Sequence, residues 1–351
     1  MTERVRKSVQ SLSGYAPGEQ PLGGGVVKLN TNENPYPPSP RVAAALAELD
    51  AQRLRLYPDP VCAALRDEIA RIHRCGPDRV FVGNGSDEVL ALCTRAFVEN
   101  EGSIGYFDPS YSLYPVLADI RGVRKCAVSL DENFGLPAEE TVPEEAVGCS
   151  LFFLANPNAP TGVLYPKEDV RRFCARGKGV VVIDEAYVDF ASGDCADLAL
   201  SMPNVLIART LSKSYSLAGL RVGYAVGALE LVEALTKIKD SYNLDMVSQV
   251  LALAALSDGA YMLENVERIR RTRRRLTAAL SEMRYTVWPS ETNFLWVRPA
   301  GVRAADLFRR LRERKILVRY FPGLRTGDFV RVTVGTDDEV DALLDALGSL
   351  G

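Results

Sequence analysis

The residue that most directly indicates chemistry is Lys213, which follows a short apolar run at residues 205–208. The hydroxyl residues Thr210 and Ser212 precede it, and Arg221 lies eight positions further along the chain. A lysine held in a dry site has a lowered pKa, so its amine can act as a nucleophile. Two hydroxyls and an arginine are suited to hold a phosphate. On this segment alone, a solvated lysine in a serine-rich loop remains an open alternative.

Two other segments place an acid and an anion-binding turn after apolar runs. The run at 180–183 ends in Asp184, whose burial would cost free energy unless a cation or strong donors meet it. A helix cap or a structural ion pair is the alternative for this carboxylate. The segment from Gly83 to Glu88 is typical of a strand, a glycine turn and a helix start capped by Ser86, which presents free N–H groups to an anion. It matches neither nucleotide-binding glycine motif, so no nucleotide is implied.

An aromatic residue and a proline turn follow two further predicted strands. Tyr111, in the segment 108–114, is placed where its ring could stack on a flat heterocycle, although core packing at a helix start is the alternative. Residues 156–162, with the sequence NPNAPTG, form a turn whose prolines are candidates for cis peptide bonds.

The elements that must position these residues alternate between strand and helix from about residue 40. We predict strands at 80–82, 103–106, 150–154, 180–183 and 205–208, and helices at 40–50, 60–73, 86–98, 110–120, 167–176 and 228–238. Continuous apolar strands separated by helices indicate a mostly parallel α/β sheet covered on both faces. All five segments follow such strands, so they can face one crevice at the carboxyl edge of the sheet.

The pattern changes after about residue 255. We predict an Arg-rich helix at 260–283, strands at 293–298, 316–320 and 329–334, a helix at 303–314 and a C-terminal helix. The predicted division is therefore a large domain over 40–255 and a second unit made of the extended arm 1–39 and a small α+β domain over 256–351. The arginines at 268–275 are interpreted as solvated or paired with Glu264 and Glu267, because the chain as a whole is acidic.

The composition of the chain disfavours several classes of function. The chain has 351 residues, of which 47% are apolar, and its net charge of −3 gives no electrostatic reason to expect nucleic acid or a membrane surface. The seven cysteines contain no C-x-x-C pair, which predicts a reducing cytoplasm and no zinc or other metal site. His73 is the only histidine and falls on a predicted surface helix, so it is given no role and Ser–His or Cys–His couples are disfavoured.

Taken together, the five segments supply a nucleophilic amine, an acid for a pyridinium, a ring to stack and a phosphate cup, which is what pyridoxal phosphate needs. The sequence resembles the fold-type I aminotransferases and, within them, the histidinol-phosphate aminotransferase family. The resemblance covers essentially the whole chain and rests on residues 29–35, 57–59, 83–88, 156–162, 184–187, 209–223 and 330–336.

The resemblance implies a role for each matching residue around the cofactor. Lys213 resembles the Schiff-base lysine and general base, and Asp184 would pair with the pyridine nitrogen and keep it protonated. Tyr187 would bond the phenolic oxygen, and Tyr111 would stack on the ring. The phosphate would be held by Gly85, Ser86, Asp87, Thr210, Ser212 and Arg221.

Two further positions bear on how the site is completed. Tyr57 resembles the tyrosine that reaches the phosphate from the partner subunit, which implies a homodimer with shared active sites. Many relatives have Asn immediately before Pro-Thr-Gly, where this chain has Ala159. Asn158, ahead of Asn156, is expected to take over its contact with the phenolic oxygen.

The reaction that the resemblance implies is transamination between L-histidinol phosphate and 2-oxoglutarate, a step of histidine biosynthesis. Arg331 is expected to bind both small-molecule substrates, and Arg319 mainly the phosphorylated one, helped by Tyr15 and Asn32 from the arm. The alternatives are an aromatic or broad-specificity aminotransferase, a phospho-amino-acid decarboxylase of the same fold, or a binding protein that kept the fold without catalysis.

Overall fold

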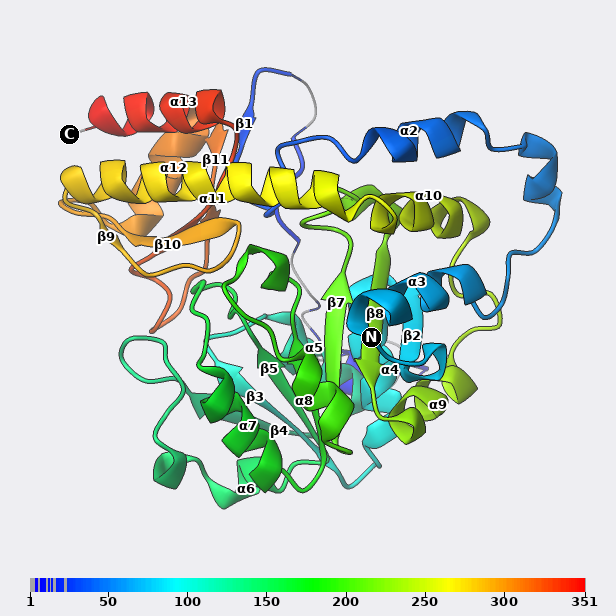
Figure 1. The fold of residues 1–351 in the computed structure, drawn as a ribbon. Coiled ribbons are helices and arrows are strands. Elements are labelled where there is room, and N and C mark those ends of the chain that lie inside the picture. Colours follow the sequence, from blue (N-terminus) through cyan, green and yellow to red (C-terminus); the bar gives the residue numbers. More distant parts are fainter. Residues whose placement is uncertain are drawn as a thin grey trace.

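The computed structural model describes residues 4–5, 7–10, 12, 14, 17–21 and 24–350. A large domain is built around one central sheet, and a smaller group of strands and helices lies beside it (Figure 1). The long helix α11 (Gly259–Glu282) runs across the top of the view, from the smaller group of elements towards α10 (Met246–Leu256).

The central sheet has seven strands in the order β2-β8-β7-β6-β5-β3-β4. Their bounds are β2 Val80–Asn84, β3 Ser103–Asp108, β4 Arg124–Ser129, β5 Leu151–Ala155, β6 Val180–Asp184, β7 Val205–Thr210 and β8 Val222–Gly227. All neighbours are parallel except β8, which runs antiparallel to both β7 and β2. The predicted mostly parallel sheet is confirmed, and the five site segments do leave it at one edge.

The sequence patterns missed two strands of this sheet, each for an identifiable reason. β4 is an edge strand in which most side chains are exposed, so it lacks the apolar run of a buried strand. β8 is fully buried but carries glycines at both Gly223 and Gly227, and glycine weakens the strand signal.

Helices cover both faces of the sheet, as its alternating side chains require. On β5, Phe152 and Leu154 join one hydrophobic cluster, and Leu151 and Phe153 join another on the opposite face. The helices of this domain are α2 Pro40–Ala47, α3 Ala63–His73, α4 Gly85–Phe97, α5 Leu113–Arg121, α6 Glu144–Val147, α7 Lys167–Arg176, α8 Ala196–Ser201, α9 Leu229–Ile238 and α10.

The smaller group contains a four-stranded sheet in the order β12-β13-β10-β9. Its strands are β9 Thr286–Val287, β10 Phe294–Arg298, β12 Arg319–Tyr320 and β13 Val330–Thr333, and its further helices are α12 Ala304–Glu313 and α13 Asp337–Gly348. The arm is not wholly extended, because it holds the short helix α1 (Lys7–Gln10), and it also contributes the strand β1 (Val27–Lys28). β1 pairs in parallel with β11 (Ile316–Leu317), which places the arm beside the last third of the chain. The division at residues 39–40 and 255–256 stays a prediction.

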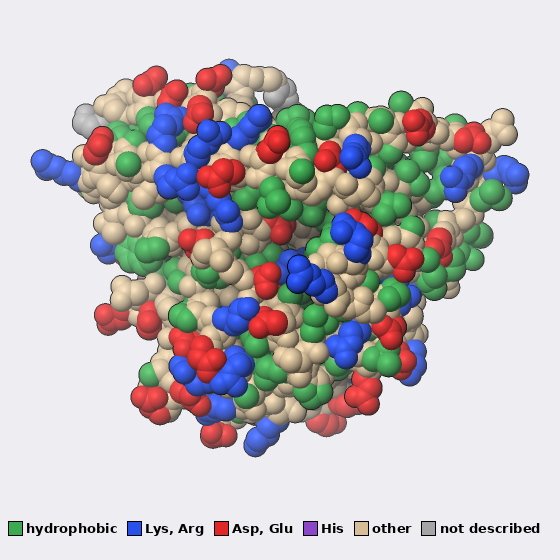
Figure 2. All heavy atoms as spheres, in the orientation of Figure 1, with side chains coloured by type: hydrophobic (Ala, Val, Ile, Leu, Met, Phe, Trp, Pro, Cys, Tyr) green, Lys and Arg blue, Asp and Glu red, His purple; other side chains and the backbone are tan. Residues whose placement is uncertain are grey.

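The arginines of α11 make contacts with other segments of the fold that the sequence pattern did not indicate. Arg274 pairs with Glu267 at 3.2 Å, as expected. Arg270 also donates to the carbonyl oxygens of Phe190 and Ala191, and Arg273 to that of Thr292. Figure 2 shows carboxylates interspersed among the basic side chains over this helix rather than a uniformly basic patch.

The prediction that His73 lies on a surface was wrong. Leu65, Ile69 and His73 are four residues apart on α3, so His73 shares the helix face that packs against the core. Its Nε2 lies 3.2 Å from the hydroxyl of Tyr224, and burial lowers the pKa of the imidazole to about 3. The ring is therefore a neutral core group.

Over the described ranges, no single helix has both the length and the hydropathy of a membrane span. Helices α10 and α11 meet those criteria only when taken together, as a pair bent by 76°.

Candidate active site

A cavity of about 240 Å³ opens where the carboxyl edge of the central sheet meets the arm and the smaller sheet. The large domain contributes strand ends and loops, the arm contributes Asn30 to Asn32, and the smaller sheet contributes Arg319 and Arg331. The predicted site residues that line it are Asn32, Ser86, Asp87, Tyr111, Asp184, Tyr187, Thr210, Ser212, Lys213, Arg221, Arg319 and Arg331.

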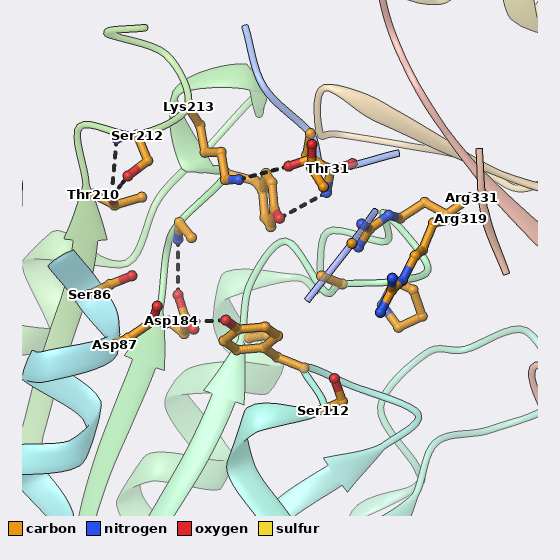
Figure 3. Close-up of a pocket in the computed structure, with 18 of the residues that line it drawn as sticks. Thr31, Ser86, Asp87, Ser112, Asp184, Thr210, Ser212, Lys213, Arg319 and Arg331 are labelled. Carbon is orange, nitrogen blue, oxygen red and sulfur yellow. Dashed lines mark hydrogen bonds between the residues drawn. The ribbon is translucent and has the colours of Figure 1, made fainter. Parts of the chain in front are cut away.

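Lys213 lies in the loop that follows β7, and its side chain points into this cavity (Figure 3). Its Nζ donates a hydrogen bond to the carbonyl oxygen of Thr31, at 3.3 Å, and lies 5.7 Å from the centre of the Tyr187 ring. Burial, helped by the positive charge of Arg331, lowers the pKa of Lys213 to about 8. At neutral pH a far larger fraction of Lys213 therefore carries a neutral amine than in the case of an exposed lysine.

Asp184 ends β6 and is almost fully buried. Two donors meet its carboxylate: the Ala186 N–H lies 3.1 Å from Oδ1, and the Tyr114 hydroxyl lies 2.8 Å from Oδ2. Burial raises the pKa of Asp184 to about 6, while both hydrogen bonds act in the opposite direction. A buried carboxylate at a cavity wall is placed to face a cation.

Tyr187 is oriented by the arm. Its hydroxyl oxygen accepts a hydrogen bond from Asn32 Nδ2 at 2.9 Å, so its own proton is available to another acceptor. Asn32 has a φ of 56° and is held by Thr333, which receives a bond from its backbone N–H and donates to its Oδ1. One amide N–H of Asn32 bonds Tyr187 and its Oδ1 accepts from Thr333, and its predicted contact with substrate stays a prediction.

The N-terminus of α4 and the strand β8 form a cup for an anion. A Cβ on Gly223 would lie 2.3 Å from the backbone nitrogen of Ser86, so only glycine lets β8 approach this helix start. Thr210 donates to Ser212 at 2.9 Å, and Arg221 lies 3.1 Å from the Asp87 carboxylate.

Gly85 begins α4 beside Arg221 and is not among the residues that line the cavity. It has a φ of 79°, and a Cβ there would lie 2.7 Å from Arg221, so the turn requires glycine. The predicted contact of Gly85 with the cofactor phosphate stays a prediction.

The expectation that Asn158 takes over from the missing asparagine is not met. Its Nδ2 donates to the Pro109 carbonyl and to Thr161, its Oδ1 accepts from Ser110, and it does not line the cavity. Asn156 is also buried outside it. Ala159 does line the wall, and the cis bonds expected in this turn are present before Pro157 and Pro160.

Arg319 and Arg331 lie side by side on neighbouring strands of the smaller sheet. They are register partners on the antiparallel strands β12 and β13, and both guanidinium carbons lie within 5.4 Å of the centre of the Phe321 ring. Arg319 donates to the Pro17 carbonyl, and Arg331 to that of Asn30. Figure 3 shows the two arginines on the opposite side of Lys213 from Ser86, Thr210 and Ser212.

Tyr57 does not line the cavity of this chain. The Tyr57 side chain is 80% exposed and stacks on Tyr242, with ring centres 4.4 Å apart. Tyr15 lies outside the described residues.

Three residues that sequence reasoning missed contribute to the site. Thr31 accepts the bond from Lys213, Phe321 lies against both arginines, and Tyr114 donates to Asp184. Tyr114 lies one turn after Tyr111 in the predicted helix and Thr31 falls within the motif at residues 29–35, whereas Phe321 carried no signal.

This donor set fits pyridoxal phosphate. The cup offers hydroxyls, an arginine and a helix N-terminus to a phosphate, Asp184 suits a protonated ring nitrogen, and Lys213 suits an aldehyde. The side of the cavity with Arg319 and Arg331 is left for the anionic end of a substrate.

Comparison with known proteins agrees with this arrangement. A family model described as aminotransferase class I and II matches residues 24–347. The chain is 45% identical over 346 residues to the histidinol-phosphate aminotransferase of Synechocystis sp., covering 99% of this chain and 98% of that protein. It is 46% identical over 347 residues to histidinol-phosphate aminotransferase 2 of Thiobacillus denitrificans, covering 97% and 96%.

Among solved structures, the histidinol-phosphate aminotransferase of Sinorhizobium meliloti, crystallised in complex with pyridoxal-5'-phosphate, has a TM-score of 0.87 to this fold. It is 27% identical and covers 100% of this chain and 99% of its own. The chain thus belongs to the class I and II aminotransferases and, within them, to the histidinol-phosphate aminotransferase family.

Proposed function

We propose that this protein is a pyridoxal-phosphate-dependent aminotransferase that moves an amino group between L-histidinol phosphate and 2-oxoglutarate, in histidine biosynthesis. Relatives at 45% and 46% identity carry that enzyme name over nearly the whole chain. The observation in this molecule that carries the choice of substrate is the pairing of Arg319 with Arg331.

Two guanidinium groups in direct cross-strand register repel each other. A bound anion offsets that repulsion, and a phosphate monoester, with a charge near −2, matches two guanidiniums better than a single carboxylate does. Arg331 also lowers the pKa of Lys213, so its charge acts on the cavity itself. We infer that Arg331 serves both substrates and that Arg319 serves mainly the phosphorylated one.

The wall of the cavity on the other side of Lys213 from the two arginines would hold the cofactor (Figure 3). Ser86, Thr210, Ser212 and Arg221 would bind its phosphate, with Asp87 orienting Arg221. Tyr111 would lie against its ring, and its hydroxyl is already bonded to Asp87 at 3.1 Å.

When bound, pyridoxal phosphate supplies an aldehyde that carries the amino group and a ring that accepts the electron pair released at the substrate Cα. Lys213 Nζ would take the proton from that Cα as general base, which a pKa near 8 permits at mildly alkaline pH. Asp184 would hold the ring nitrogen protonated, and Tyr187 would donate its free proton to the phenolic oxygen.

We also propose a homodimer with shared active sites, working in the cytoplasm. Tyr57 has no part in its own cavity, and Leu54, Leu56 and Val61 beside it are exposed apolar side chains, as expected of a surface that a second copy covers. The seven free cysteines support a reducing compartment. Sedimentation equilibrium measures the assembly directly, and a monomer at micromolar concentration would contradict it.

The decisive experiment compares amino donors in wild type and in Arg319→Ala. Losing one charge-assisted contact to a desolvated anion costs roughly 2–5 kcal/mol, so kcat/KM for histidinol phosphate should fall by about 30-fold or more. The value for glutamate should fall far less, because Arg331 remains. Arg309→Ala is the matched control, since Arg309 is exposed and pairs with Asp306 on its own helix.

Each alternative gives a different result. Equal losses for both donors, or a wild-type preference for phenylalanine over histidinol phosphate, would support an aromatic aminotransferase. Turnover without any 2-oxo acid would indicate a decarboxylase, and no turnover with any donor would indicate a binding protein.

A further inference from the structure

Tyr114 lies directly behind the cavity wall and touches the carboxylate that the proposed cofactor would need. It is the second residue of α5 and is fully buried. Its ring stacks on Phe153 of β5, with centres 4.9 Å apart, and meets the ring of Tyr111 edge-on at 5.6 Å. These contacts hold the Tyr114 ring from two sides and so fix the position of its hydroxyl.

The hydroxyl points at Asp184. It lies 2.8 Å from Oδ2, while the Ala186 N–H occupies Oδ1. Burial raises the pKa of Tyr114 well above its usual range, so the phenol stays protonated and the bond keeps one direction, from Tyr114 to Asp184. A hydrogen bond donated to a carboxylate favours its anionic form, against the burial that raises the pKa of Asp184.

We propose that Tyr114 is a positioning residue for the reaction: its hydroxyl fixes the orientation of the Asp184 carboxylate and favours the anion that holds the cofactor ring nitrogen protonated. The inference rests on the proposed function, because Asp184 has this task only if pyridoxal phosphate binds there. The same helix start then places both Tyr111, against the ring, and Tyr114, behind the acid.

The first test uses the cofactor-free protein, so it does not depend on activity. Tyr114→Phe removes the hydroxyl and keeps the ring packing. Titration of carboxyl-labelled aspartate by NMR, with Asp184 assigned from the Asp184→Asn spectrum, should show the Asp184 pKa rising by about one unit. Tyr165→Phe is the matched control, since Tyr165 is also buried and its hydroxyl has no hydrogen-bond partner among the described residues. It should leave Asp184 unchanged.

The second test uses the loaded enzyme. In Tyr114→Phe we expect kcat to fall about tenfold with KM changed by less than about twofold, and the pH titration of the bound cofactor's absorbance to shift. In an Asp184→Asn background the same change should cost less than about twofold, because a residue that acts through Asp184 has nothing left to act on.

A third variant covers the case in which Tyr114→Phe does not fold. Replacing Tyr114 by 3-fluorotyrosine keeps its shape and makes the hydroxyl a stronger donor, so the Asp184 pKa should fall. An unchanged Asp184 titration in either variant, or a full tenfold loss in the Asp184→Asn background, overturns the proposal. Wild type that does not transaminate would refute the proposed function instead, while the titration of the cofactor-free protein still decides the role of Tyr114.

Discussion

The chemistry of Lys213 depends on what surrounds its amine more than on the residue itself. Its Nζ has a single carbonyl as hydrogen-bond partner among the described residues, and the charges that act on it include the positive Arg331. Both burial and that charge penalise the ammonium form. The same arginine that we assign to substrate binding therefore helps to keep the nucleophile neutral.

We predict that labelling of Lys213 in the cofactor-free protein follows this lowered pKa. Only the neutral amine reacts with trinitrobenzenesulfonate, so labelling should rise with pH and reach half its maximum near pH 8. Arg331→Gln removes a positive charge, so the pKa should rise and the midpoint should move to higher pH by up to about one unit. Mass spectrometry of the labelled peptide measures this, with Lys237 of α9 as an internal reference for the reagent. A midpoint that stays or moves to lower pH would contradict the assignment.

At the scale of elements, the phosphate cup depends on how closely β8 approaches α4. β8 is the one antiparallel strand of the central sheet, and it lies between β2, which leads into α4, and β7, which leads into the lysine loop. The start of β8 therefore brings Arg221, the residue just before it, next to the N-terminus of α4. The approach is so close that the position facing Ser86 has no room for a side chain.

We predict that Gly223→Ala separates these two elements. Overpacking of this kind costs about 1–3 kcal/mol, which urea unfolding measures. Pyridoxal phosphate should also bind more weakly, since the helix N-terminus moves away from its phosphate. Gly219→Ala is the control, because among the described residues no heavy atom beyond its chain neighbours lies within 4 Å of a Cβ at that position. If both variants bind the cofactor as wild type does, the cup does not depend on this contact.

At the scale of the whole molecule, the cavity exists because two sheets are held together. Arg325, in the loop between β12 and β13, donates to the carbonyls of Asp108, Leu130 and Asp131 at the ends of β3 and β4. Its guanidinium also lies 5.6 Å from the centre of the Phe134 ring. This loop therefore links the smaller sheet to the ends of β3 and β4 in the central sheet.

We predict that Arg325→Ala loosens this junction. Charge-assisted bonds of this kind are worth roughly 1.5–3 kcal/mol, so the free energy of unfolding should fall by about that amount. Amide hydrogen exchange should become faster in residues 130–136, with residues 181–183 of the central sheet unchanged. Arg303→Ala, which removes an ion pair at the start of α12, should do neither. Protection of 130–136 equal to wild type would show that the loop is not what joins the sheets.

Much of the site could be predicted from sequence because its residues follow strands. Apolar runs locate β5, β6 and β7 without any alignment, and parallel strands bring their carboxyl ends to one edge. Lys213 and Asp184 come within a few residues of such ends, so their convergence follows from local pattern alone. Helical periodicity located the predicted helices to within a few residues, but α1, α6, α8 and α10 were not predicted.

What the tertiary structure alone decided is the direction of each polar side chain. Asn32 bonds Tyr187, 155 residues away, and Thr333, 301 residues away, so no local pattern reports these partners. Asn158 turns from the cavity because Pro109 and Thr161 accept its protons, and Arg319 meets Arg331 because β12 pairs with β13 in one register. Strand periodicity is a property of neighbouring residues, and sequence therefore determined which segments reach the site. Hydrogen-bond partners come from remote elements that meet only on folding, and the packed structure therefore determined which atoms face the cavity.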